Sequence, residues 1–541
     1  MTLLRLALIL ALLCPACASS QLASNTPVDR PEGSVRAGDW AQTNRPSLIV
    51  LITVDQLLND YLTRFGPQLT GGLARFARGG AWFTDAHHDH AITETAPGHA
   101  TLLAGRFPRS TGIADNLGGV EDPAAPLVGG ASGLSASPAR FQGTTLVDWL
   151  RARDSSTRTL SVSMKDRGAI LPVGRSRAEV YWYSLNGSFT TSRYYRESLP
   201  EWVNRFNARR LPQSFAGKSW TPLLPDSAYR EIDAEPLETA GVDFVFPHVM
   251  PADTVAAVSQ VRVTPWMDEI TFALALDGLQ ALSLGQGTRT DVLAISLSAT
   301  DLIGHAFGPD SKEIHDQVLR LDQSMKAFVD SLFKMRDSLR ITFALTSDHG
   351  VGTIPEIAGR TMRPGPHRVN VSVPLTSLRA RLAALGIPPG AMDVGPRTVR
   401  IGRAARASRQ QGVDSALAAF ANEVRAIPGV ARVDRFRDLI DRDTLTDPVA
   451  RRWSHQFADT SDVELVVTLT PFSIYGTIVA THGSPLDYDT RVPLIFYGPQ
   501  FRAGRYPEFV RTVDLAPTLA NIAGVTPSEK LDGVVLKQAI R

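Results

Sequence analysis

Cysteine is almost absent from this sequence of 541 residues: only Cys14 and Cys17 occur, both within the first twenty. Disulfides therefore cannot stabilise the rest of the chain, which must rely on its core and on any metals that it binds. An excess of charge of one sign is also lacking, because 56 Lys and Arg face 54 Asp and Glu, for a formal net charge of +2. This balance gives no indication of a nucleic-acid partner.

Long apolar runs are missing as well. The run Leu6–Leu13 is too short for a permanent membrane-spanning helix. It follows a single positive charge and precedes small residues, a pattern typical of a secretory signal peptide over residues 1–18. Cleavage after Ala18 fits, and so does cleavage before a lipid-modified Cys17, which would be the only link to a membrane. We expect an exported, periplasmic protein with or without that anchor.

Buried strands and helical patterns alternate along the rest of the chain. After a polar linker at 19–45, continuous apolar runs predict strands that are buried on both faces of a sheet, at Ser47–Val54, Asp291–Ser298, Ile341–Thr346 and Val492–Tyr497. Helical stretches lie between or after them. The alternation predicts an α/β fold in which helices cover both faces of a mostly parallel central sheet.

Two segments differ in composition from this core. Residues 169–275 and 360–475 are rich in aromatic residues, Pro and Arg and contain only short strand-like pieces. We interpret them as α+β insertions that form a cap over one edge of the sheet, the second as a cap subdomain. The core then has three parts, at 46–168, 276–359 and 476–541.

Six side chains that suit a metal ion lie near the ends of the predicted strands: Asp55, Asp301, His305, Asp348, His349 and His482. Ligands of open α/β sheets bind beyond the carboxyl ends of the strands, which makes these positions informative. Each residue alone has an ordinary explanation, such as a helix cap or an ion pair. Together, three carboxylates and three imidazoles suit zinc, and two ions with three ligands each could clamp the attacking and leaving oxygens of a displacement.

A candidate nucleophile lies in the segment that begins Thr95-Ala-Pro-Gly-His. Pro97 and Gly105 suit the start and the end of a short helix, so the Thr95 hydroxyl would lie at a helix N-terminus, where a phosphoryl group is also favoured. An alcohol needs a base or a metal to become a good nucleophile, and zinc could bind Thr95 as an alkoxide. Alone, Thr95 would read as an N-cap.

Three further polar residues could contact an anion. Asn116 stands at a turn and could donate its amide to a phosphoryl oxygen. Lys165 and Arg167 follow the strand-like segment 159–162, and their alternate spacing could direct both cations to one anion. A solvated surface turn is the ordinary alternative for this pair.

These motifs together resemble the alkaline phosphatase superfamily, and most closely the monomeric, periplasmic PafA-type enzymes with a threonine nucleophile. The resemblance covers nearly all of the chain after the linker. It implies that Asp301, His305 and His482 hold one zinc ion and that Asp55, Asp348 and His349 hold the other. It also implies that Thr95 is transiently phosphorylated, that Asn116, Lys165 and Arg167 contact phosphoryl oxygens, and that no magnesium is essential. The expected activity is the hydrolysis of small phosphate monoesters.

Other members of the superfamily remain as alternatives. A nucleotide pyrophosphatase or phosphodiesterase would share the metal residues, the threonine and the asparagine, but it would lack the paired cations. A sulfatase needs Cys or Ser in place of Thr95 and Arg in place of His99. A cofactor-independent mutase usually carries serine and works in the cytoplasm. An inactive exported binding protein would be expected to have lost ligands, and none is lost here.

A second group of metal-like residues occurs at 87–90, with the sequence His-His-Asp-His. Directly adjacent residues rarely converge on one ion. We interpret this segment as structural.

Overall fold

The computed structural model describes residues 45–541 except 408 and 441–445. The predicted signal peptide, the lipid-modified Cys17 and all but the last residue of the predicted linker lie outside the described residues. Within the described ranges, no helix is both long and apolar enough to cross a membrane.

A nine-stranded sheet forms the core, in the order β17-β2-β16-β9-β1-β8-β3-β4-β5. Its strands are β1 (Leu48–Val54), β2 (Ala81–His87), β3 (Thr159–Ser163), β4 (Glu179–Tyr183), β5 (Phe189–Thr190), β8 (Asp291–Leu297), β9 (Ile341–Thr346), β16 (Arg491–Tyr497) and β17 (Gly504–Arg511). The five central strands β9, β1, β8, β3 and β4 are parallel to one another, whereas β16 is antiparallel to both of its neighbours. The prediction of a mostly parallel α/β sheet is confirmed.

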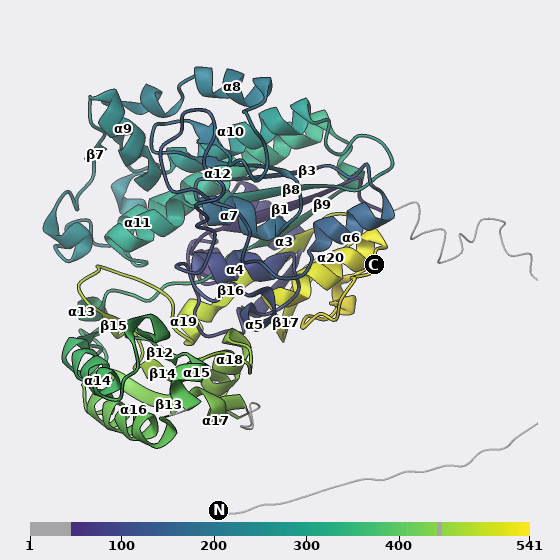
Figure 1. Cartoon of the computed structure of the whole chain (residues 1–541). Helices are drawn as coiled ribbons and strands as arrows, with labels where there is room; N and C mark the ends of the chain where they lie inside the picture. Colours follow the sequence, from purple (N-terminus) through teal and green to yellow (C-terminus); the bar gives the residue numbers. More distant parts are fainter. Residues whose placement is uncertain (1–44, 408, 441–445) are drawn as a thin grey trace, which may run out of the picture. The chain divides into compact units, whose positions relative to one another are not determined.

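Helices cover both faces of this sheet (Figure 1). Alternate residues of β1 belong to two different cores: Leu48, Val50 and Ile52 pack in one, and Ile49 and Leu51 pack in the other. The first core includes α3 (Gly72–Gly79), α10 (Trp266–Ala281) and α12 (Lys312–Met335). The second includes α4 (Thr95–Leu102), α6 (Leu146–Arg153) and α20 (Leu515–Ala523). A continuous apolar strand is the expected consequence of burial on both sides.

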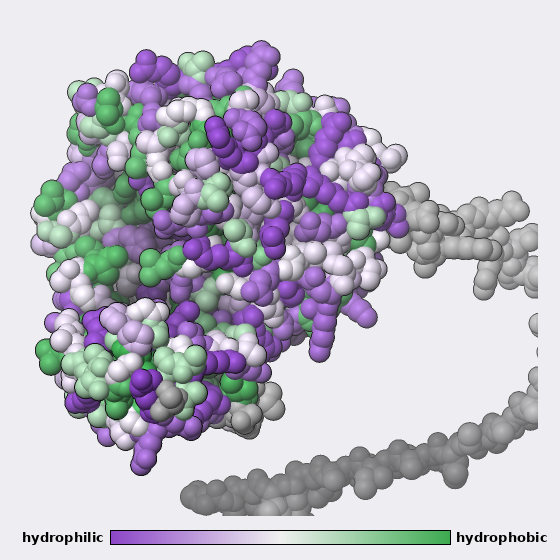
Figure 2. Space-filling view, viewed as in Figure 1, coloured by the Kyte–Doolittle hydropathy of each residue, from purple (hydrophilic) through white to green (hydrophobic). Residues whose placement is uncertain are grey.

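A smaller subdomain lies within the range 360–475. Its four-stranded antiparallel sheet has the order β11 (Met392–Val394), β12 (Thr398–Ile401), β14 (Val463–Leu469) and β13 (Val430–Arg435). Helices α14 (Ser372–Ala384) and α16 (Gln410–Arg425) pack against it around a core of their own. We call this part the cap. Figure 2 shows that hydrophilic residues cover much of the visible face of the molecule, with apolar residues scattered among them.

The segment 169–275 differs in part from the insertion that its composition suggested. Its strand β4 pairs with β3 and extends the main sheet. Tyr181 packs in one core, and Val180 and Trp182 pack in the other, so this strand is buried on both faces like the central ones. Aromatic side chains here fill the core of the sheet.

Candidate active site

The six candidate ligands converge because the central strands end at the same level. Val54 of β1 pairs with Leu297 of β8, and Thr53 pairs with Thr346 of β9. The chain segments that follow these strands therefore start from one edge of the sheet. They carry Asp55, then Asp301 and His305 on α11 (Ala299–Phe307), then Asp348 and His349.

The structure brings the six residues together as two groups of three. Asp301, His305 and His482 form the first group, and Asp55, Asp348 and His349 form the second; within each group one ligand atom per residue lies within 4.8 Å of the others. These are the two sets that the resemblance implied. In the first group, Asp301 Oδ1 lies 3.3 Å from His305 Nε2 and 3.6 Å from His482 Nε2. In the second, His349 Nε2 lies 3.3 Å from an Asp55 oxygen and 3.6 Å from an Asp348 oxygen.

All three histidines are oriented in the same way. The Nδ1 atoms of His305, His349 and His482 lie 2.8, 2.9 and 2.7 Å from the carbonyl oxygens of Ala480, Gly350 and Thr93. A carbonyl oxygen only accepts, so each Nδ1 carries the proton and each Nε2 faces the carboxylates. Backbone anchoring of one ring nitrogen while the other is directed at a common point is the usual arrangement around a protein-bound metal.

The electrostatics of the site also fit bound cations. Asp55, Asp348 and His349 are completely buried. Burial, reinforced by the charges of Asp301 and Asp348, raises the pKa of Asp55. Among the residues that the structure describes, neither carboxylate oxygen of Asp55 has a partner with hydrogen-bond geometry, although Lys165 lies close by. Burial opposes the charged form of His349, but Asp348 and Asp55 outweigh it and raise the pKa of His349 to about 9. Buried negative charge therefore dominates, and the donor set can hold metal ions.

Thr95 lies between the second group and Lys165. It is the first residue of α4, and its Oγ1 lies 3.5 Å from His349 Nε2 and 3.4 Å from Lys165 Nζ. The first turn of α4 packs tightly on the second group, since a Cβ at Gly98 would lie 2.2 Å from the carbonyl oxygen of Asp348. The helix N-terminus is thus held against the candidate metal ligands.

Lys165 bridges the two groups. It precedes α7 (Asp166–Ile170), and its Nζ lies 2.5 Å from Asp55 Oδ2 and 2.5 Å from Asp301 Oδ2. Burial disfavours the ammonium form, but Asp301 and Asp55 outweigh burial and raise the pKa of Lys165, so the side chain is a cation. One positive charge is therefore fixed between the two groups of ligands.

Arg167 and Asn116 lie at the margin of this arrangement. Arg167, on α7, has an ion contact of 3.6 Å with Asp166, and its Nε is buried without a hydrogen-bond partner among the described residues. Asn116 Oδ1 accepts the Ala96 N–H at 2.9 Å, which leaves the amide NH₂ to donate elsewhere. The sequence suggested that Lys165 and Arg167 face one anion; the structure directs Lys165 to the carboxylates and to Thr95.

Two residues that hold the ligands received no role from the sequence. Gln56 donates from Nε2 to Asp301 at 2.9 Å and from its backbone N–H to Asp348 at 3.2 Å, with φ at +68°. His99 Nδ1 lies 3.1 Å from Asp348 Oδ2, and its Nε2 lies 2.9 Å from Ser296 Oγ. The signals available were the position of Gln56 directly after Asp55 and the presence of His99 in the nucleophile motif. Neither signal identifies a partner some 250 residues away.

The segment 87–90 has structural contacts. His88 Nε2 lies 2.8 Å from the Ser347 carbonyl oxygen, and the buried Asp89 lies 3.0 Å from Arg451 and 2.8 Å from Arg511. These contacts tie the segment to neighbouring elements of the core and the cap.

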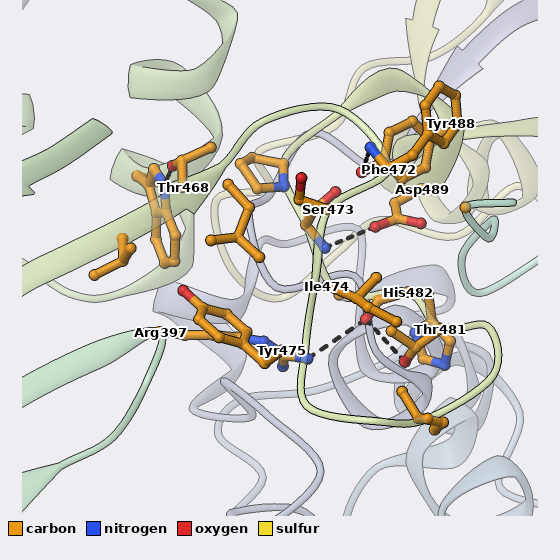
Figure 3. Close-up of a pocket in the computed structure, with 18 residues that line it drawn as sticks. Arg397, Thr468, Phe472, Ser473, Ile474, Tyr475, Thr481, His482, Tyr488 and Asp489 are labelled. Carbon is orange, nitrogen blue, oxygen red and sulfur yellow. Dashed lines mark hydrogen bonds between the residues drawn. The ribbon is translucent and has the colours of Figure 1, made fainter. Parts of the chain in front are cut away.

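A cavity of about 190 Å³ lies behind the loop that carries His482 (Figure 3). Its walls come from this loop and the residues that follow it, from the cap and from Gly352, and they include Tyr475, Tyr488 and Arg397. Figure 3 shows the Arg397 guanidinium donating to the carbonyl oxygen of His482. The cap thus reaches the segment that supplies one of the candidate ligands.

Comparisons with known proteins identify the family of the chain. The model of the type I phosphodiesterase / nucleotide pyrophosphatase family matches residues 49–366. The chain is 36% identical over 376 residues to alkaline phosphatase PhoV of Synechococcus elongatus, covering 66% of this chain and 68% of PhoV. It is 30% identical over 521 residues to alkaline phosphatase PhoK of Sphingomonas sp, covering 90% of each chain.

A solved structure shares the fold over nearly the whole chain. The crystal structure of wild-type alkaline phosphatase PafA superimposes with a TM-score of 0.82 at 25% sequence identity, covering 92% of this chain and 99% of PafA. The chain therefore belongs to the type I phosphodiesterase / nucleotide pyrophosphatase family and is an enzyme of its PafA-like alkaline phosphatase branch.

Proposed function

We propose that this protein is a zinc-dependent phosphomonoesterase that releases inorganic phosphate through a phosphorylated Thr95. The observation that carries the proposal is the position of the Thr95 hydroxyl, 3.4 Å from the Lys165 ammonium and 3.5 Å from His349 Nε2. A nucleophile, a fixed cation and two groups of metal-type ligands meet there at the N-terminus of α4. The names of PhoV, PhoK and PafA support the same activity.

The donor chemistry favours zinc at both groups. Each group offers carboxylate oxygen and imidazole nitrogen, a mixture that suits zinc better than magnesium or calcium. Asp301, His305 and His482 would hold one ion, and Asp55, Asp348 and His349 would hold the other. When bound, such ions supply Lewis acidity to the hydroxyl of Thr95 and to the leaving oxygen of the ester. Lys165 occupies the space between Asp55 and Asp301 as a cation, which supports the expectation that no magnesium is essential.

The residues of the chain itself perform the remaining tasks. Thr95 Oγ1 gives up its proton and attacks phosphorus, the bond from phosphorus to the leaving oxygen breaks, and that oxygen takes up a proton and departs as the alcohol in line with the attack. Water then attacks phosphorus, the bond to Thr95 Oγ1 breaks, one proton of the water returns to Thr95 Oγ1, and inorganic phosphate is released. Lys165 and the N-terminus of α4 favour the negative charge of the transferred group, while the Asn116 amide, whose carbonyl oxygen is already occupied, donates to a phosphoryl oxygen.

A diesterase is the second candidate, because the matching family model describes phosphodiesterases and nucleotide pyrophosphatases. Lys165 argues against it. A monoester dianion carries one more negative charge than a diester and gains more from a buried ammonium. Arg167, whose Nε has no hydrogen-bond partner in the described part of the chain, could add a second positive charge.

We further propose export to the periplasm, from the signal-peptide pattern of residues 1–18, either as a free protein or with a lipid anchor at Cys17. The enzyme would act as a monomer on small phosphate monoesters, without a nucleic-acid partner.

The test compares an aryl phosphate monoester with the matching diester, using purified zinc-loaded protein, Thr95→Ala and Thr95→Ser. We expect a strong preference for the monoester, its loss in Thr95→Ala and a partial activity in Thr95→Ser. Acid quenching with labelled substrate should trap phosphate on the peptide that contains Thr95. A preference for the diester would indicate the second candidate, and full activity in Thr95→Ala would overturn the nucleophile. Hydrolysis of neither substrate would favour an inactive binding protein.

A further inference from the structure

The cap sends polar side chains into the segments that carry the nucleophile and Asn116. Arg397 lies directly before β12, and Gln456 is the last residue of α18 (Pro448–Gln456). The Arg397 side chain contacts Glu94 and the backbone carbonyl oxygen of His482. The Gln456 side chain bonds to the backbone of the two segments that carry Thr95 and Asn116.

Gln456 joins the two segments on either side of the site. Its Oε1 accepts the Ile92 N–H at 2.7 Å, and its Nε2 donates to the Ala114 carbonyl oxygen at 2.6 Å. The side chain is completely buried. Ile92 lies three residues before Thr95, and Ala114 lies two residues before Asn116. One amide thus sets the spacing between the nucleophile segment and the Asn116 turn.

Arg397 forms a second link through Glu94, the residue before the nucleophile. One oxygen of Glu94 accepts the Asn116 N–H at 2.8 Å, and the other is ion-paired with Arg397 Nη1. Arg397 Nη2 donates to the His482 carbonyl oxygen at 3.4 Å. The His482 loop approaches the guanidinium closely, because a Cβ at Gly483, where φ is +107°, would lie 2.8 Å from Arg397 Nη2.

We propose that Arg397 and Gln456 are positioning residues: through them the cap fixes the nucleophile segment, the Asn116 turn and the His482 loop relative to one another. The catalytic part of this inference rests on the proposed function. The cap then helps to position the catalytic residues. A displacement of about 1 Å at a reacting group can lower a rate about 100-fold, so such links have catalytic consequences.

The geometry requires an arginine. Nη1 is directed to Glu94 and Nη2 to the His482 carbonyl oxygen, so the two contacts use both arms of a planar fork. A lysine would keep the charge and would satisfy one of the two acceptors. Arg397→Lys should therefore behave more like Arg397→Ala than like the wild type.

The experiment compares full-length, zinc-loaded wild type with Arg397→Ala, Arg397→Lys and Gln456→Leu. Arg403→Ala is the matched control, because Arg403 is also a cap arginine but donates to Ser461 within the cap. We expect kcat for the aryl monoester to fall about 100-fold in each test variant, with KM changed by less than about threefold. The control should stay within about twofold of the wild type.

Two readouts separate positioning from general destabilisation. The cavity beside Arg397 gives free guanidinium a route to the space that Arg397→Ala leaves empty. Millimolar guanidinium should therefore restore part of the activity of Arg397→Ala, whereas the activity of Gln456→Leu should not change. Hydrogen exchange should be at least about tenfold faster at the amides of Ile92 and Asn116 in the test variants than in Arg403→Ala.

Test variants with control-like kcat and unchanged exchange at Ile92 and Asn116 would overturn the inference. If Arg397→Ala does not fold, Arg397→Lys and Gln456→Leu decide the question by the same measurements. If the wild type does not hydrolyse monoesters, the proposed function fails by itself, and the exchange comparison still decides whether the cap positions these segments.

Discussion

Replacing Lys165 by Met should reduce activity on monoesters much more than activity on diesters. Methionine has a similar length and no charge, so the change mainly removes the ammonium that lies 3.4 Å from Thr95 Oγ1. A phosphoryl group at Thr95 would carry its oxygens within about 4 Å of this charge. At that separation one unit of charge is worth about 4 kcal/mol at an effective dielectric of 20 and about 1 kcal/mol in water.

The extra negative charge of the monoester should therefore be worth about 2–3 kcal/mol, or about 30- to 150-fold in relative kcat/KM. Loss of Lys165 also leaves Asp55 and Asp301 without their shared cation, which should lower the rates for both substrates. That common loss cancels in the ratio of the monoester rate to the diester rate. The ratio thus isolates the interaction with the additional charge.

The assay measures kcat/KM for an aryl phosphate monoester and the matching diester, at a pH where the monoester is a dianion. Lys312→Met is the control, since Lys312 is another buried lysine, which contacts Asp226 and Asp233. The control should keep the wild-type ratio even if it loses stability. Equal losses on both substrates in Lys165→Met would refute the assignment of Lys165 to the phosphoryl charge.

Further predictions concern stability. Chelation should lower the Tm, because six clustered acids and imidazoles lose their partner charges. At a free ion concentration of about 1,000 times the Kd, each bound ion contributes about 4 kcal/mol to the free energy of unfolding. An unchanged Tm would exclude structural metal. Asp89→Asn should lower the free energy of unfolding in urea by about 3–5 kcal/mol, because the arginines around this buried carboxylate lose their counter-charge. A decrease of less than about 1 kcal/mol would contradict this prediction. Burial, with the charges of Glu313, Glu235 and Asp233, raises the pKa of Glu238 to about 9 from an ordinary 4.5. As the pH rises, the unfolded chain therefore loses this proton before the folded chain does. The contribution of Glu238 to the free energy of unfolding should then decrease as the pH rises from about 5 to about 9. Glu238→Gln should therefore gain Tm relative to the wild type as pH rises over that range, and a constant difference would contradict the shift.

Local pattern and strand-end geometry explain why much of the site could be predicted from the sequence. Asp55, Asp348 and His349 directly follow apolar strands, so their positions followed from the rule for the carboxyl ends of parallel strands. Asp301 and His305 are four residues apart on one helix, and that spacing fixes a shared face. His482 has a weaker cue, because it lies in a loop before a strand, and the resemblance alone grouped it with Asp301 and His305.

The supporting contacts could not be predicted, because they join residues that are distant in sequence. Glu94 and Arg397 are 303 positions apart, and Ile92 and Gln456 are 364 apart. Composition predicted a cap over one edge of the sheet. It shows where a segment differs from the core, but it does not show which side chains of that segment point toward the site. The contacts of Lys165 with Asp55 and Asp301 could not be predicted either, because alternation along a strand does not continue into the turn that follows it.

The summed charge of the site gives a further reason to expect a preference for monoesters. Asp55, Asp301 and Asp348 with Lys165 carry a net charge of −2, which two divalent ions would convert to +2. Deprotonation of Thr95 would subtract one charge, and Arg167 adds one nearby, so the value seen by the substrate remains +2. A monoester dianion neutralises that charge, whereas a diester leaves one positive charge unmatched in a buried site, where unpaired charge is costly. A magnesium ion in place of Lys165 would raise the positive charge by one more unit, so a lysine at this position and a preference for dianionic monoesters follow from the same balance.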